Sequence, residues 1–257
     1  VDQGSVAIEG AGLNASNIDQ FETITRSAKI NAEIQAQHLA VIAGANDVDA
    51  KTLNATARTT NPADAPQLAI DSSALGGMYA GAIRLVGTEK GVGVNMSGEM
   101  AASTGDIQID ANGKVTVAGM GANQAIAIKA QSIDLKGKAY AGTEATLQAK
   151  EQIEVGTSLA ARDQVRVVDA GQLVNHGIIE AGVNSDNSRN DQGVVKLNAD
   201  NLENRGDVLA SRSLQLTARQ TLSNQNGVIQ GPKVEVKAAR LVNQGGQARV
   251  LAHNELV

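Results

Sequence analysis

The sequence predicts an all-β protein folded as a right-handed parallel β-helix, a solenoid with about 20 residues per coil. The first observation is that six apolar residues recur at spacings of 20, 20, 29, 20 and 19 residues: Ile133, Ile153, Leu173, Leu202, Leu222 and Leu241. The second is that short segments around them alternate apolar and polar side chains, as strands with one buried face do. The third is that one Phe, two Tyr and no Trp leave Val, Ile, Leu and Ala to build the core.

Composition narrows the class of function. The 257 residues include no Cys, which excludes disulfides, thiolate nucleophiles and Cys-ligated metals. A net charge of −5 and so few aromatic residues disfavour nucleic acid as a partner. No stretch approaches the roughly 18–20 apolar residues that span a bilayer. The chain starts without Met or a signal-peptide pattern, so we expect a fragment or processed piece of a longer protein.

The first half of the chain alternates less regularly. Strand patterns occur in residues 5–43 and resume at Ile83 and Val92, but residues 44–76 break them with two of the three prolines. A segment of this length without core periodicity is usually an excursion from the scaffold. We therefore expect an extra-helical flap at about 44–76, lying on the side of the rod.

The second half is a series of similar units. Ordering one 20-residue coil costs about 20–40 kcal/mol in conformational entropy, and four buried aliphatic side chains return only about 1.5–3 kcal/mol each. Stacking must close this deficit, because it buries both faces of a coil and pairs its backbone. About twelve coils at the spacing of paired strands would make a rod of roughly 55–60 Å.

Four of the units place Asn two residues after the apolar residue, with Gly close behind. Such Asn residues should fall at the same corner of successive coils, where Asn tolerates left-handed backbone and Gly relieves the turn. Their amides could bond one another from coil to coil, although a solvated turn residue is the alternative for each. The expected ladder is Asn175, Asn204, Asn224 and Asn243.

The 29-residue spacing contains a polar insertion at 183–192, which we interpret as a loop between repeats. Loops on rigid scaffolds carry recognition, so this loop and the flap are the expected contact surfaces if the chain binds a cell-surface receptor. The contact residues in the loop would be Asn184, Asp186, Arg189 and Asp191. Its composition is that of a cation loop, but the residue order of known calcium motifs is missing, so no metal is expected.

Enzymatic chemistry is not expected. His38, His176 and His253 lie far apart, and neither metal-ligand spacing nor a phosphate-binding glycine loop occurs, so no small-molecule cofactor is predicted. Many β-helices are polysaccharide lyases or hydrolases, which makes such an enzyme the alternative. Asp134 and Glu154, one coil apart, are the pair that could form its site, although like charges on adjacent coils more often simply face water.

Several motifs are similar to one known family. Ala69–Asp71, Gly77–Tyr79, Ile83–Val86 and Gly91–Val94 resemble the secretion domain of the filamentous-haemagglutinin family, and Ala40–Asn46 resembles another landmark of that domain. The Asn-Gly units between Leu173 and Gly245 resemble the haemagglutinin repeats of the family. The resemblance divides the chain into the C-terminal part of a two-partner-secretion-type domain, 1–120, and haemagglutinin-type repeats, 121–257.

The resemblance implies a structural shaft segment of a large secreted bacterial exoprotein, either an adhesin or a carrier of a contact-dependent growth inhibition toxin. The parent protein would cross the periplasm and reach the cell surface through an outer-membrane two-partner-secretion transporter. The family's Asn-Pro-Asn export motif is missing, since Asn61-Pro62-Ala63 is not one. The isolated chain should fray at Val1–Gly10 and after Gly245, and should associate with concentration, because its end coils expose strand edges.

Overall fold

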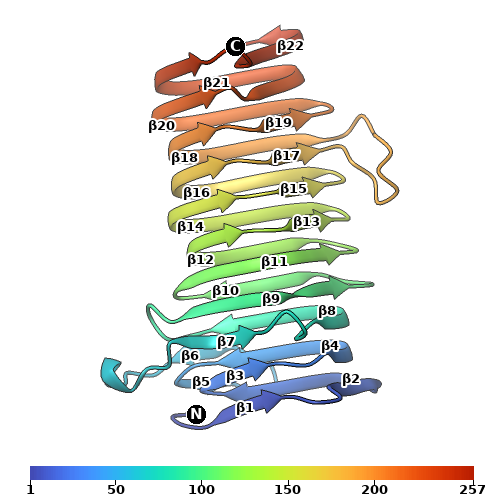
Figure 1. Cartoon of the computed structure of the whole chain (residues 1–257), viewed down its shortest axis with the longest axis vertical. Coiled ribbons are helices and arrows are strands. Elements are labelled where there is room, and N and C mark those ends of the chain that lie inside the picture. Colours follow the sequence, from blue (N-terminus) through green and yellow to red (C-terminus); the bar gives the residue numbers. More distant parts are fainter.

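Strands stack in parallel from one end of the molecule to the other in the computed structural model, which describes residues 1–257 (Figure 1). Twenty strands form one continuous sheet, and β5 and β6 form a separate antiparallel pair. The predicted parallel β-helix is therefore confirmed. The first part contains β1 (Ser5–Ile8), β2 (Leu13–Thr25), β3 (Ser27–Ile30), β4 (Ile34–Ala43), β5 (Asn46–Val48), β6 (Ala55–Ala57), the 3-10 turn η1 (Pro62–Asp64), β7 (Leu68–Ser72), β8 (Met78–Gly87), β9 (Gly93–Ala102), β10 (Ile107–Ala111) and β11 (Lys114–Ala122). The second part contains β12 (Ile126–Leu135), β13 (Lys138–Ala141), β14 (Glu144–Val155), β15 (Ser158–Ala161), β16 (Gln164–Asn175), β17 (Ile178–Ala181), β18 (Val194–Asn204), β19 (Asp207–Ala210), β20 (Ser213–Gln225), β21 (Val228–Gln244) and β22 (Arg249–Leu256).

The sequence repeat is the coil. Each of the six recurring apolar residues lies directly opposite the next one in the parallel ladder, from Ile133 to Leu241. The 29-residue spacing does not disturb this register, because Gln164 at the start of β16 still pairs with Val194 at the start of β18. The extra residues leave the stack as the long loop between β17 and β18 (Figure 1).

Alternation along one coil sends every second side chain inward. β14 bends where its register shifts, between Ala149 and Gln152, so it supplies two faces of the coil and β15 supplies the third. The inward residues of this coil are at most 2% exposed: Ala145, Leu147, Ala149, Ile153, Val155, Leu159 and Ala161. Stacked coils join these residues into one cluster of 58 buried side chains without a single aromatic ring. Methionine, which was not among the expected core residue types, also contributes to it at four positions: Met78, Met96, Met100 and Met120.

The chain leaves the stack between β4 and β7. There it forms the β5–β6 hairpin and the turn η1, which project at one side of the molecule (Figure 1). This flap is shorter than the expected 44–76, because β7 pairs with both β3 and β9 and buries Ala69 and Ile70 completely. Leu53 of the flap packs with Ala40 and Ile42 in a second small core, so the hairpin is docked. No helix in the structure is long and apolar enough to cross a membrane.

Candidate functional site

The four predicted ladder residues form one hydrogen-bonded column. The side-chain amide nitrogen of Asn175 donates to Oδ1 of Asn204 at 2.8 Å, Asn204 donates to Asn224 at 2.8 Å, and Asn224 donates to Asn243 at 2.7 Å. Each of the first three amides also donates to the carbonyl oxygen of the Gly that follows it, at 2.8–3.2 Å. These bonds satisfy polar groups that would otherwise be costly to bury.

The column lies inside the solenoid up to its exposed last member, Asn243, whereas the sequence suggested a corner between strands. Asn175 is paired with Val155, and the same register continues to Leu135, so the asparagines occupy an interior position that is aliphatic in earlier coils. Asn175, Asn204 and Asn224 are completely buried. None of the four has a positive φ, so the expected left-handed backbone is wrong. Each of the four asparagines is the last or the second-last residue of its strand. Their amides form hydrogen bonds where the earlier coils have aliphatic packing.

The glycines of the first two units, Gly177 and Gly206, are explained by the approach of neighbouring coils, whereas Gly245 of the last unit has a φ of +106°. A Cβ atom on Gly177 would lie 1.9 Å from the carbonyl oxygen of Thr157, and one on Gly206 would lie 2.0 Å from that of Gly177. Neither glycine has a positive φ. The motif therefore pairs an inward Asn with a Gly that lets the next coil approach.

The loop 183–192 is held together by its own side chains. Oδ1 of Asp186 accepts hydrogen bonds from the Ser188 hydroxyl at 2.6 Å and backbone nitrogen at 2.9 Å, which lower the pKa of Asp186. Asn184 donates to the Ser188 hydroxyl at 2.9 Å, and Asp191 accepts from Gln192 at 2.6 Å. No three carboxylate or imidazole side chains gather into a cluster able to hold a metal ion.

Three side-chain contacts tie the loop to the shaft, and in one of them Asn190 donates to the carbonyl oxygen of Arg162 at 3.1 Å. The hydroxyl of Tyr140 donates to the carbonyl oxygen of Val183 at 3.0 Å, and burial raises the pKa of this tyrosine. Nη2 of Arg189 lies 3.0 Å from Oε1 of Glu180 in β17. Burial raises the pKa of Glu180, and the positive charge of Arg189 opposes that effect. Of the expected contact residues, Arg189 therefore also serves as an anchor.

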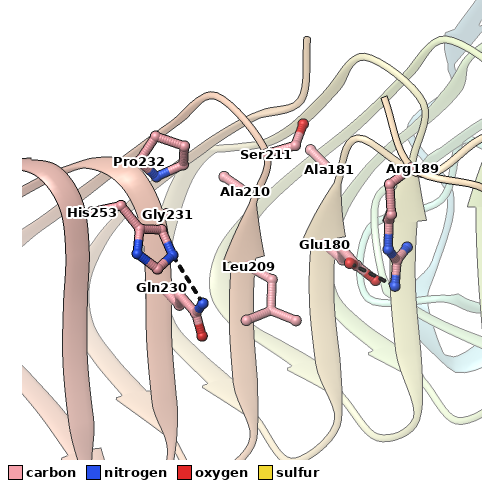
Figure 2. Close-up of a pocket in the computed structure, with 10 residues that line it drawn as sticks. All are labelled: Glu180, Ala181, Arg189, Leu209, Ala210, Ser211, Gln230, Gly231, Pro232 and His253. Atoms are coloured by element: carbon pink, nitrogen blue, oxygen red, sulfur yellow. Dashed lines mark hydrogen bonds and ion pairs between the residues drawn. The ribbon is translucent and has the colours of Figure 1, made fainter. Parts of the chain in front are cut away.

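A groove of about 340 Å³ opens beside the loop (Figure 2). Glu180 and Arg189 lie on one side of it, Gln230 and His253 on the other, and Leu209 lies between them (Figure 2). Nε2 of His253 is 3.2 Å from Nε2 of Gln230. Glu180 and Gln230 both pair with Leu209, so they lie two coils apart. The groove between them could accept part of a bound partner.

Asp134 and Glu154, the acidic pair of the alternative enzyme site, are stacked, but each contacts a different basic side chain. Asp134 lies opposite Glu154 in the ladder. Asp134 is 3.4 Å from the ammonium of Lys114, and Glu154 is 3.3 Å from Nε2 of His176. The three histidines stay apart: His38 contacts the carbonyl oxygen of Asp19, and His253 lies near the C-terminal end.

The contacts that hold the flap join residues far apart in the chain, and no sequence pattern indicated them. Glu89, only 6% exposed, pairs with Arg26 at 2.9 Å and accepts a hydrogen bond from the Thr60 hydroxyl of the flap at 3.3 Å. Asn46 at the start of β5 is fully buried and donates to the Thr88 hydroxyl at 3.3 Å. Arg26 and Glu89 are 63 residues apart in the chain, so no local pattern connects them.

Known proteins match both the first part and nearly the whole of this chain. Residues 1–117 match the TPS secretion domain. The tRNA nuclease CdiA of Yersinia mollaretii is 37% identical in an alignment of 243 residues that covers 88% of this chain and 8% of that relative. The 16S rRNA endonuclease CdiA of Enterobacter cloacae subsp. cloacae is 35% identical over 248 residues, 95% of this chain and 7% of that relative. The chain belongs to the filamentous haemagglutinin/CdiA family of two-partner secretion proteins.

Family membership fixes where the protein works. Its TPS secretion domain and its CdiA relatives indicate export through the outer membrane to the cell surface. A further relative, the tRNA nuclease CdiA-2 of Burkholderia pseudomallei, is 47% identical over 119 residues, 46% of this chain and 4% of that relative. The chain thus spans less than a tenth of the length of these family members. No solved structure matches it.

Proposed function

We propose that this chain is a structural shaft segment of a large two-partner-secreted exoprotein. The observation that carries the proposal is the parallel ladder, which continues from β1 to β22 around one core of 58 buried residues. Each coil contacts its neighbours in the stack, as in other solenoids, so the number of coils sets the length of the rod. The partner of the parent protein is an outer-membrane two-partner-secretion transporter.

The parent is better described as a toxin carrier than as an adhesin. Its relatives include nucleases of the CdiA type, and the part shared with this chain is a small fraction of each. We infer that any nuclease activity belongs to another part of the parent and that this segment is not an enzyme. We also propose that 1–120 acts in secretion and that 121–257 extends the shaft.

Removal of one whole coil tests the shaft proposal. Deleting residues 144–163 joins Thr143 to Gln164, which is the register partner of Glu144, so the stack can close. We expect the shortened chain to fold, to lose about 5 Å of length in X-ray scattering, and to leave export of the parent intact. Deleting residues 144–153 is the matched control, because half a coil destroys the register. A whole-coil deletion that unfolds the chain or blocks export as severely as the control would overturn the proposal.

Two alternative functions have direct tests. A polysaccharide-active enzyme would release reducing ends from acidic polysaccharides, and Glu154→Gln would abolish that release.

A receptor-binding module would lose cell binding when residues 184–191 are replaced by a short Gly-Ser link. That deletion should spare folding, because Gly182 and Gly193 at the ends of the loop stay on the shaft. The groove beside the loop is the observation that favours this second candidate.

A further inference from the structure

Three lysines converge on one hollow in the side of the shaft. Lys90 follows β8, Lys129 lies in β12, and Lys150 lies in β14. Together with Asn112 and Gln131 they line a volume of about 570 Å³, which we call the lysine hollow. This volume falls within the usual range of sites for small ligands.

Register brings the lining residues together. Asp110 in β10 pairs with Lys129 in β12, and Ala130 in β12 pairs with Ala149 in β14. Gln131 and Lys150 each follow one of these paired alanines, where the register shifts, and both line the hollow. The small side chains of Ala111 and Ala130, both buried, leave room between the longer polar ones.

The three ammonium groups have no carboxylate partners. None of the ion pairs in the structure includes Lys90, Lys129 or Lys150. The acidic neighbours of two of them in sequence are occupied elsewhere. Glu89 turns inward to Arg26, and Glu151 accepts hydrogen bonds from Gln131 at 2.7 Å and from Ser132 at 3.0 Å.

The lysine hollow is therefore positive on an acidic protein. Asp110 is the one carboxylate among its lining residues, against three lysines, whereas the whole chain has a net charge of −5. Like charges held near one another without counterions raise the energy of the unliganded site, and an anion relieves that repulsion. The amides of Asn112 and Gln131 add polar groups beside the ammonium groups.

We propose that the lysine hollow binds a ligand with more than one phosphate group. An ammonium group binds phosphate as a point charge, so each lysine can contact a separate phosphate group. Three lysines at three points of the hollow therefore fit a ligand with several phosphates better than a ligand with one. The phosphates could be those of a small free anion or those carried by a sugar, and both have the same chemistry. This inference does not rest on the shaft role, since a shaft that binds no ligand would fold in the same way.

Calorimetry on the whole chain tests the proposal with two probes, inorganic pyrophosphate and glucose 1,6-bisphosphate. The test variant is Lys90→Gln/Lys129→Gln/Lys150→Gln. The matched control is Lys136→Gln/Lys138→Gln/Lys196→Gln, which removes the same charge from three lysines that are also exposed and unpaired. We expect binding that weakens as salt rises, a loss of about tenfold or more in the test variant, and a change of less than about twofold in the control.

Each outcome has a defined reading. Binding of pyrophosphate alone assigns the hollow to small free anions, and stronger binding of the bisphosphate assigns it to phosphorylated sugars; both support the proposal. If neither probe binds, or if both triple variants weaken binding equally, the proposal is wrong. Circular dichroism of the variants must match the parent chain, and single Lys129→Gln replaces the triple variant if it does not.

Discussion

At the scale of single residues, the ladder was predictable in part. The recurrence of Asn at coil spacing correctly indicated which residues stack, because register follows from the repeat itself. Their burial could not be predicted, because an Asn followed by Gly also has the sequence of a turn. The one sequence signal for an inward position is that Asn175 falls one repeat after the aliphatic Val155, and the structure shows these two residues paired.

The interior column predicts a sharp contrast between two asparagines. Asn224→Ala should lower the free energy of unfolding by about 1–3 kcal/mol, because it removes the buried Oδ1 that accepts from the Asn204 amide and the amide that donates to Gly227 and Asn243. Asn201→Ala is the control, since Asn201 bonds Gln220 at the surface and should cost less than about 0.5 kcal/mol. Urea denaturation measures both, and equal losses would contradict the ladder.

Glu180 should make stability depend on pH. Burial raises its pKa above the ordinary value of 4.5, so the folded state holds this proton more tightly than the unfolded chain. Stability should therefore fall as pH rises from the unfolded pKa towards the folded one. Glu180→Gln should flatten that slope in denaturation experiments. Arg189→Met should raise the pKa of Glu180 further in an NMR titration, and an unchanged pKa would show that the loop does not control this carboxyl.

At the scale of elements, strand periodicity predicted the coils well and the flap less well. The repeat from β12 onward follows from alternation alone. β7 was missed because its five residues follow a proline-containing segment, and its burial depends on pairing with β3 and β9. The docking of the flap was also unpredictable, because Arg26, Glu89 and Thr60 come together only when the coils have stacked.

The buried ion pair beneath the flap should be strongly coupled. Arg26→Met or Glu89→Met alone leaves one charge poorly solvated and should cost about 3 kcal/mol or more, whereas the double variant should cost less than the sum. Denaturation gives the coupling energy. Trypsin should also cut faster after Lys51 and Arg58 of the flap in the single variants. Additive losses and unchanged cleavage would mean that the pair does not hold the flap.

At the scale of the whole molecule, the stack has uncovered strands at both ends. β1 pairs only with β3, β22 pairs only with β21, and Leu241 and Leu256 are 53% and 59% exposed. Hydrogen exchange should be fastest at Val1–Gly10 and after Gly245 in the isolated chain. Sedimentation should reveal association that grows with concentration, and Leu241→Asn/Leu256→Lys should reduce it. A chain that stays monomeric at high concentration would contradict exposed edges as the cause.

The backbone hydrogen bonds between coils run along the long axis of the solenoid, and this direction has a mechanical consequence. Backbone hydrogen bonds join one coil to the next, so tension applied to the two termini pulls the coils apart singly, beginning at the ends. Each coil contributes about 5 Å to the rod, yet its 20 residues span about 66–72 Å when extended. Optical tweezers should therefore record steps of about 60 Å. Such a filament would lengthen under load by unfolding one coil at a time, while the covalent chain stays intact.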